Sequence, residues 1–103
     1  MAKYIRKKDD RTPFNIGVGR RLRETRLVLD YDTTRSFAEA LGIQEDRLGK
    51  WENGDVPIPP LYARQLKVRF AITTDWLYTG DPSGLPAGLY RALKDFIESE
   101  DEM

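Results

Sequence analysis

The chain of 103 residues contains neither cysteine nor histidine. These absences exclude disulfide frameworks, thiol nucleophiles, the usual zinc sites and imidazole acid–base catalysis. No apolar run approaches the roughly 20 residues that cross a bilayer, and no apolar segment follows the basic stretch MAKYIRKKDD, as it would in a secretory signal. The acidic residues are scattered, and there is no glycine-rich phosphate loop. We therefore expect one small cytoplasmic domain that is not an enzyme, needs no metal or cofactor and does not enter a membrane.

Charge is balanced over the chain but unevenly distributed along it. Of the 17 basic and 17 acidic side chains, nine basic and three acidic lie within residues 1–26. Residues 81–103 hold two basic and six acidic side chains. Basic arms often follow phosphate groups, and acidic tails often stay solvated or face a basic partner. We expect residues 1–12 to form a flexible basic arm, either one that follows phosphate or a terminus without a role.

Helix signals divide most of the chain. Thr12 and Pro13 resemble an N-cap followed by a first-turn proline. The run DVPIPP at 55–60 is rich in proline and predicts a stiff connector. Periodic apolar residues predict helices over about 13–29, 60–70, 74–78 and 89–99, with residues 81–88 as a linker. The side chains expected to face the core from the first and fifth helices are Val18, Leu22, Thr25, Leu29, Trp76 and Leu77.

Residues 34–54, TRSFAEALGIQEDRLGKWENG, form the most informative stretch. They predict two short helices, over about 34–41 and 44–53, with a turn at Gly42 and a stop at Gly54. Apolar residues at helical spacing mark the inward face of each helix: Phe37, Ala38, Leu41, Leu48 and Trp51. The layout is that of a helix-turn-helix. From spacing alone, the alternative is two unrelated amphipathic helices in a small bundle.

Three segments extend this pattern: RRLRETR at 20–26, FAEALGI at 37–43 followed by LGKWENG at 48–54, and TTDWLYTGD at 73–81. Their order and spacing resemble the Cro/repressor-type helix-turn-helix family, also called the XRE family, across residues 18–80. The resemblance implies an all-α fold, a five-helix lambda-repressor-like DNA-binding domain over residues 13–80. Residues 81–103 would add a linker, a C-terminal amphipathic helix and an acidic tail.

The resemblance also implies which residues contact double-stranded DNA. The second motif helix would read base edges, with Gln44 suited to adenine and Lys50 to guanine. The expected base-reading positions are Gln44, Glu45, Asp46, Gly49 and Lys50, with Arg47 at a base or a phosphate. The expected phosphate contacts are Thr33, Thr34, Asn53, Arg20 and Arg23. Arg26 and Glu52 would form a partly buried structural ion pair.

The sequence departs from the family pattern at Thr34 and Glu45, where glutamine is common. Glu45 and Asp46 place two carboxylates at the end of the helix that faces the groove. Three interpretations remain open. The carboxylates complement the helix dipole and face solvent, or one of them accepts a hydrogen bond from cytosine N4, or they mark a motif that no longer binds DNA.

The resulting hypothesis is a transcriptional regulator of phage, prophage or bacterial type, with repression as the expected mode because the chain has no sizeable effector domain. It would bind a pseudo-palindromic operator as a homodimer. The alternative is a protein-binding module, such as an antitoxin or adaptor, whose acidic C-terminal helix engages a protein partner. Residues 85–99 are the expected dimer interface, which they would form through the apolar stripe of their helix, and the alternative is that this stripe folds back near Trp76 and Tyr78. This stripe consists of Leu89, Leu93, Phe96 and Ile97.

Overall fold

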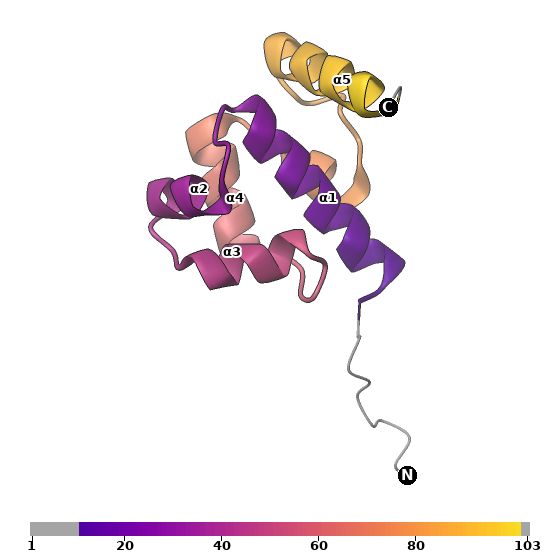
Figure 1. Cartoon of the computed structure of the whole chain (residues 1–103). Helices are drawn as coiled ribbons and strands as arrows, with labels where there is room; N and C mark the ends of the chain where they lie inside the picture. Colours follow the sequence, from indigo (N-terminus) through magenta and orange to yellow (C-terminus); the bar gives the residue numbers. More distant parts are fainter. Residues whose placement is uncertain (1–10, 102–103) are drawn as a thin grey trace.

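A computed structural model describes residues 11–101, and every regular element in that range is a helix (Figure 1). The elements are α1 (Pro13–Val28), α2 (Thr34–Leu41), α3 (Glu45–Glu52), α4 (Pro60–Phe70), the short π-helical segment η2 (Asp75–Thr79) and α5 (Ala87–Asp101). The all-α prediction is confirmed. All but the last two residues of the predicted basic arm lie outside the described range.

Helix α1 runs through the middle of the molecule and begins as the sequence predicts. Thr12 is the N-cap, and its Oγ1 accepts a hydrogen bond of 3.0 Å from the backbone N–H of Asn15. Val18, Leu22 and Thr25 are buried, and Leu29 is partly buried at the end of the helix. Contacts from α3, η2 and α5 all converge on α1. Helix α1 therefore positions α3, η2 and α5, and α2 packs on α3.

The segment η2 closes the core against α1. The indole Nε1 of Trp76 donates to Thr25 Oγ1 (3.0 Å), which in turn donates to the backbone oxygen of Arg21 (2.6 Å). Leu77 beside it is fully buried. The predicted core roles of Trp76 and Leu77 are confirmed, and the one polar atom of the Trp76 ring has its partner inside the protein.

The connector DVPIPP is not helical up to Pro60, where α4 begins. Ile58 anchors the connector in the core, and the hydroxyl of Tyr78 donates to its backbone oxygen (2.5 Å). Helix α4 ends at Phe70, and its C-cap is Ala71. Ala71 adopts a left-handed conformation with φ of 61°, which is uncommon for a residue other than glycine. Helix α4 lies beside α3, where the rings of Tyr62 and Trp51 meet with their centroids 5.3 Å apart.

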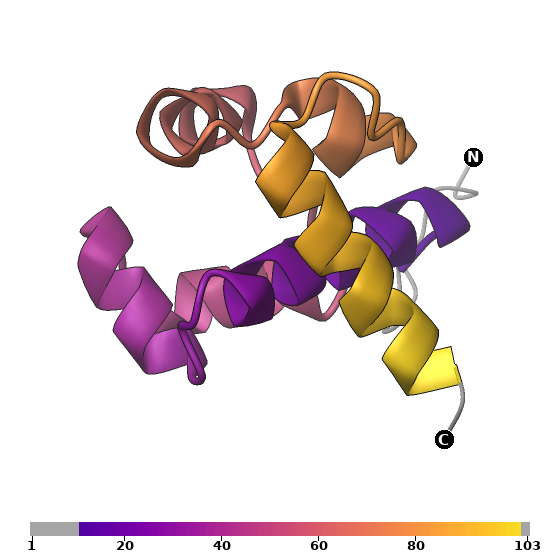
Figure 2. The ribbon, with the colours of Figure 1, turned by 90° about the horizontal axis from the view of Figure 1, so that it is seen from above.

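Helix α5 lies across α1, and the two views of the ribbon agree on this crossing (Figure 2). Leu93 is 2% exposed within the chain itself, and Leu89 and Ile97 pack against the core. The stripe therefore folds back on its own domain, as the alternative interpretation held. The prediction of a dimer interface is wrong for Leu93, because this side chain has almost no exposed surface with which to contact a second copy. Of the four stripe residues, Phe96 alone lies outside the core cluster.

The limits of α5 also differ from the prediction. The helix spans Ala87–Asp101 rather than residues 89–99, and its acidic last turn does not unwind before Asp101. Leu85, which the sequence assigned to a linker, is buried in the core just before α5 begins. Its burial brings the start of α5 against the body of the protein. Within residues 11–101, no helix combines the length and apolar character that crossing a membrane requires.

Candidate nucleic-acid interface

Helices α2 and α3 pack against each other through the apolar faces that the sequence predicted. Gly42 takes a left-handed conformation with φ of 72°, and the N–H of Ile43 returns to the oxygen of Ala38 (3.0 Å). This is the backbone geometry that lets a helix end at glycine and the chain turn at once into the next helix. The five inward-facing side chains predicted for these helices are all buried: Phe37, Ala38, Leu41, Leu48 and Trp51.

The opposite side of α3 is open and forms one wall of a shallow hollow. Glu45, Asp46 and Lys50 project from it into solvent, and Gly49 leaves open space where another residue would place a β-carbon. Six predicted DNA-contacting residues share this hollow, although they come from two separate stretches of chain. They are Thr34, Glu45, Asp46, Gly49, Lys50 and Asn53. Gln44 is exposed immediately before α3.

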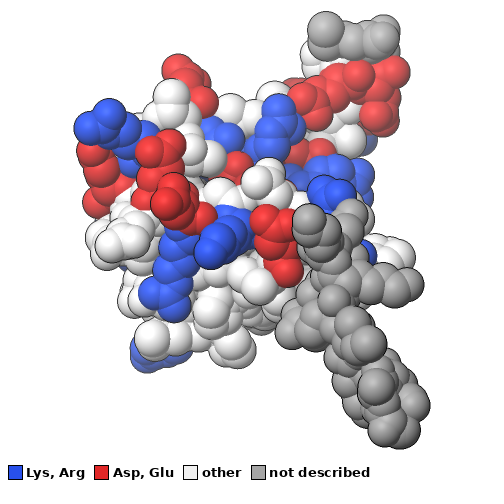
Figure 3. Space-filling model, turned by 60° about the horizontal axis from the view of Figure 1, so that its bottom comes forward, with Lys and Arg blue, Asp and Glu red and all other residues white. Residues whose placement is uncertain are grey.

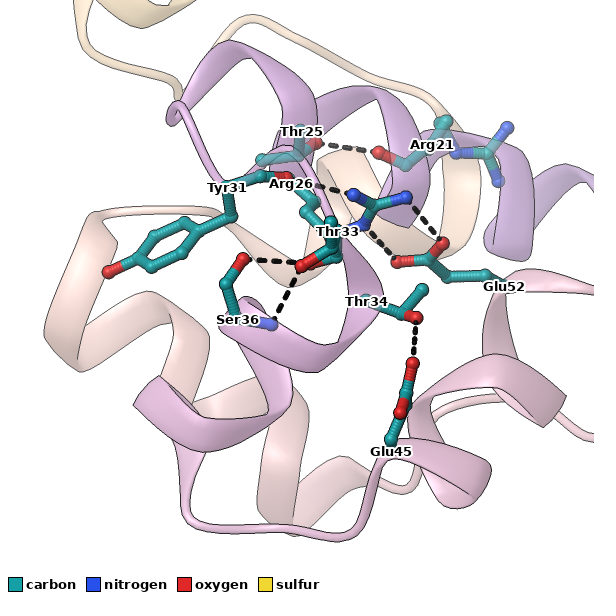
Figure 4. A network of polar contacts seen from close by, with 9 residues as sticks. All are labelled: Arg21, Thr25, Arg26, Tyr31, Thr33, Thr34, Ser36, Glu45 and Glu52. Carbon is teal, nitrogen blue, oxygen red and sulfur yellow. Dashed lines mark hydrogen bonds and ion pairs between the residues drawn. The ribbon is translucent and has the colours of Figure 1, made fainter.

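The first turns of α2 and α3 are joined by a hydrogen bond at the rim of this hollow (Figure 4). The hydroxyl of Thr34 donates to Glu45 Oε2 at 2.9 Å. Thr33 beside it is the N-cap of α2, and its Oγ1 accepts from the backbone N–H of Ser36 (3.0 Å). Thr33 is therefore engaged in capping its own helix, whereas Thr34 orients a side chain of the neighbouring helix.

Arg47 is not part of the hollow. Its guanidinium lies over the ring of Tyr62 in α4, 4.7 Å from the ring centroid, and donates to the Tyr62 hydroxyl (3.2 Å). The same group lies 5.6 Å from the ring centroid of Trp51. The structure thus stacks Arg47 on two aromatic rings, an interaction that the sequence analysis missed.

Arg20 and Arg23 are exposed on α1 and do not line the hollow. Arg23 Nη1 lies 3.9 Å from Glu100 Oε2 near the end of α5, and Arg20 is one turn earlier on the same side of α1. In both ribbon views, α5 and α3 lie on opposite sides of α1. Neither of these two arginines is among the six residues that line the hollow.

A buried ion pair fixes the far end of α3 to α1. Arg26 donates from Nε to Glu52 Oε2 (2.8 Å) and from Nη2 to Glu52 Oε1 (3.2 Å), and its Nη1 donates to the backbone oxygen of Tyr31 (2.8 Å). The two side chains are only 7% and 5% exposed. The expected Arg26–Glu52 pair is thus present, in the fork-to-fork geometry that suits arginine and a carboxylate.

The electrostatic character of the hollow is mixed. Two of its side chains are carboxylates and one is an ammonium group, and basic and acidic groups are interspersed over the face that carries α3 (Figure 3). The hollow can both donate and accept hydrogen bonds. Within the described part of the chain, no cluster of acidic residues is placed to hold a metal ion.

Comparison of the chain with protein-family models, with curated proteins and with solved structures found no match.

Proposed function

We propose that the protein is a sequence-specific DNA-binding transcriptional regulator of the Cro/repressor helix-turn-helix type. Helices α1 to α4 and η2 would be a lambda-repressor-like domain, and α5 an addition to it. One observation carries the proposal. Helix α3 is buried on its Leu48 and Trp51 side, and its opposite side presents donors and acceptors in an open hollow. An exposed helix of this kind enters a major groove, where base edges offer complementary groups.

The side chains at the exposed side of α3 differ in whether they donate or accept hydrogen bonds, and so they suit different bases. Lys50 can donate only, and guanine presents the acceptors O6 and N7 in the major groove. Gln44 both donates and accepts, which suits adenine. Asn53, at the other end of α3, is exposed at the rim and suits a phosphate oxygen. The backbone N–H groups at the start of α2 lie near the same rim and favour phosphate as well.

A single copy would contact few base pairs, because α3 spans only Glu45–Glu52. Tight specific binding by so small a surface calls for a second copy, and a homodimer on half-sites about one helical turn apart supplies it. Leu93 cannot form the contact between copies. Phe96, half-buried on α5, and Tyr90, which is 43% exposed there, remain as surface for it.

A protein-binding module is the second candidate, and the mixed charge of the hollow favours it. Glu45 and Asp46 repel phosphate, and Arg47 is held on Tyr62 rather than offered to DNA. In this case the hollow, or the acidic end of α5, would face a basic protein. The basic residues that the sequence places within 1–12 are the argument for DNA.

A selection from random duplex DNA at controlled salt tests the proposal, because it reports both base preference and electrostatics. Wild type should enrich a pseudo-palindromic site. Lys50→Ala should weaken binding to that site by about 1–3 kcal/mol and leave binding to random duplex almost unchanged. Lys67→Ala is the matched control, because Lys67 is exposed on α4. This substitution removes the same positive charge at a place outside the hollow.

Two results would count against the proposal. Equal loss on the selected site and on random duplex would show that Lys50 does not read a base. If wild type binds no duplex in a salt-dependent way, the DNA-binding proposal fails and the protein-binding candidate takes its place.

A further inference from the structure

We infer that Glu45 selects cytosine at one position of each half-site, and that Thr34 is the positioning residue that makes this selection possible. The inference rests on the proposed DNA-binding function and adds a base preference to it. It also separates the two carboxylates at the start of α3, which the sequence alone leaves equivalent.

The hydrogen bond between Thr34 and Glu45 holds the carboxylate in place. Thr34 is the first residue of α2 and Glu45 the first residue of α3, so the bond links the exposed ends of two helices. Figure 4 shows the Glu45 carboxylate directed toward the Thr34 hydroxyl. One carboxylate oxygen, Oε2, is held at 2.9 Å, and Oε1 remains as an acceptor in the hollow.

Asp46 differs from Glu45 in this respect. Its side chain lines the same hollow, but no side chain among residues 11–101 donates a hydrogen bond to it. A free side chain loses rotamer freedom when it binds, whereas a held one has already lost it. Of the two carboxylates, Glu45 is therefore the one prepared to make a directional contact.

A carboxylate accepts hydrogen bonds and donates none, and this property decides the base. Guanine and thymine present acceptors in the major groove and would repel it. Adenine has a donor at N6, but its N7 acceptor lies beside that donor. Cytosine presents the N4 amino group and carries no acceptor of its own at the major-groove edge, so it is the base that a carboxylate prefers.

Lys50 also favours a C·G base pair. It is a donor, and it lines the hollow together with Glu45. A hollow that holds one positioned acceptor and one donor matches the two edges of a C·G pair, cytosine N4 and guanine O6 or N7. The selected half-site should therefore contain C·G pairs facing the start of α3.

The test compares the sequences selected by wild type and by variants. Glu45→Gln keeps the length of the side chain but adds a donor, so the preference at one half-site position should change from cytosine to adenine while the other positions stay as they were. Asp46→Asn is the matched control and should leave that position unchanged. Replacing the preferred cytosine by thymine in the wild-type site should weaken binding on the order of tenfold.

Thr34 is tested through the ratio of two affinities, that for the site with cytosine and that for the site with thymine. We call it the cytosine-to-thymine ratio. Thr34→Val removes the hydroxyl with little change in shape and should bring the ratio close to one, and Thr34→Ser keeps the hydroxyl and should restore it. A merely structural role for Thr34 would lower the affinity for both sites equally and leave the ratio as it was. Thermal unfolding of each variant shows whether the fold is retained.

The two proposals fail in different ways. Wild type that enriches no site overturns both of them. Wild type that enriches a site, with no position responding to Glu45→Gln, overturns the role of Glu45 and leaves DNA binding intact. A cytosine-to-thymine ratio that Thr34→Val does not change overturns the positioning role of Thr34.

Discussion

Gly19 of α1 lies directly against the backbone of Trp51 in α3: a β-carbon at Gly19 would come within 2.5 Å of the Trp51 oxygen. The oxygen of Glu52 is equally close to that position. The two helices can meet here only because glycine has no side chain, and this contact sets the angle at which α3 leaves the body of the protein. We expect Gly19→Ala to lower the free energy of unfolding by about 1–3 kcal/mol, measured by urea denaturation.

Gly49 provides the matched control, because it is also a helical glycine but has nothing within 4 Å of its β-carbon position. Alanine is about 1 kcal/mol better than glycine in a helix interior, so Gly49→Ala should raise stability by up to about that amount. If Gly19→Ala stabilised the protein as Gly49→Ala does, the close approach of α1 and α3 would be refuted.

The ion pair between Arg26 and Glu52 gives the second prediction. Glu52→Ala leaves a guanidinium buried without its carboxylate, and breaking a buried pair in this way costs about 3–5 kcal/mol. The exposed pair of Arg35 and Glu39 on α2 is the control, with side chains 76% and 71% exposed. Glu39→Ala should change stability by no more than about 0.5 kcal/mol. Similar losses for both variants in urea denaturation would contradict the structural role of Glu52.

The sequence predicted the parts of the fold whose causes are local. The N-cap at Thr12 and the left-handed turn at Gly42 depend on a few neighbouring residues. The burial of Leu48 and Trp51 follows from helical spacing. These features can be read from a short window of sequence, and each is present in the structure.

The remaining features depend on residues that are distant along the chain. Nothing near Gly19 shows that α3 will pass against it, since its contact residues lie more than 30 positions later. The stacking of Arg47 on Tyr62 requires knowing where α4 lies beside α3. In the candidate site, the sequence named the six residues of the hollow, but not that Thr34 would hold Glu45.

Glu24 gives a prediction of pH dependence. Burial raises the pKa of its carboxyl group, and Glu100 raises it further, while Arg20, Arg23 and Arg21 oppose the shift. The folded state therefore holds this proton more tightly than the unfolded chain does. The stability gained from protonation is fully present below the unfolded pKa and is lost as pH rises through the folded pKa.

We therefore expect Glu24→Gln to be more stable than wild type at pH 7, because it removes the cost of an ionised group under α5. The advantage should shrink as pH falls through the folded pKa and vanish below the unfolded pKa, where Glu24 is protonated in both states. Urea denaturation of both proteins over this pH range measures the difference. A variant less stable than wild type at pH 7 would show that attraction to the three arginines outweighs burial.

Leu93 and Phe96 differ in their environments, although both belong to the apolar stripe of α5. Leu93 is buried in the core that α5 shares with α1, whereas Phe96 is half-buried outside that cluster. Leu93→Ala should cost about 2–5 kcal/mol in urea denaturation, as expected for a leucine removed from a packed core.

Phe96→Asp should leave the fold intact. If the copies of a dimer meet through Phe96, sedimentation of Phe96→Asp should show a folded monomer with reduced affinity for the selected site. A dimer that persists in this variant would place the contact elsewhere, and a stable, folded Leu93→Asp monomer would mean that α5 does not pack on its own domain.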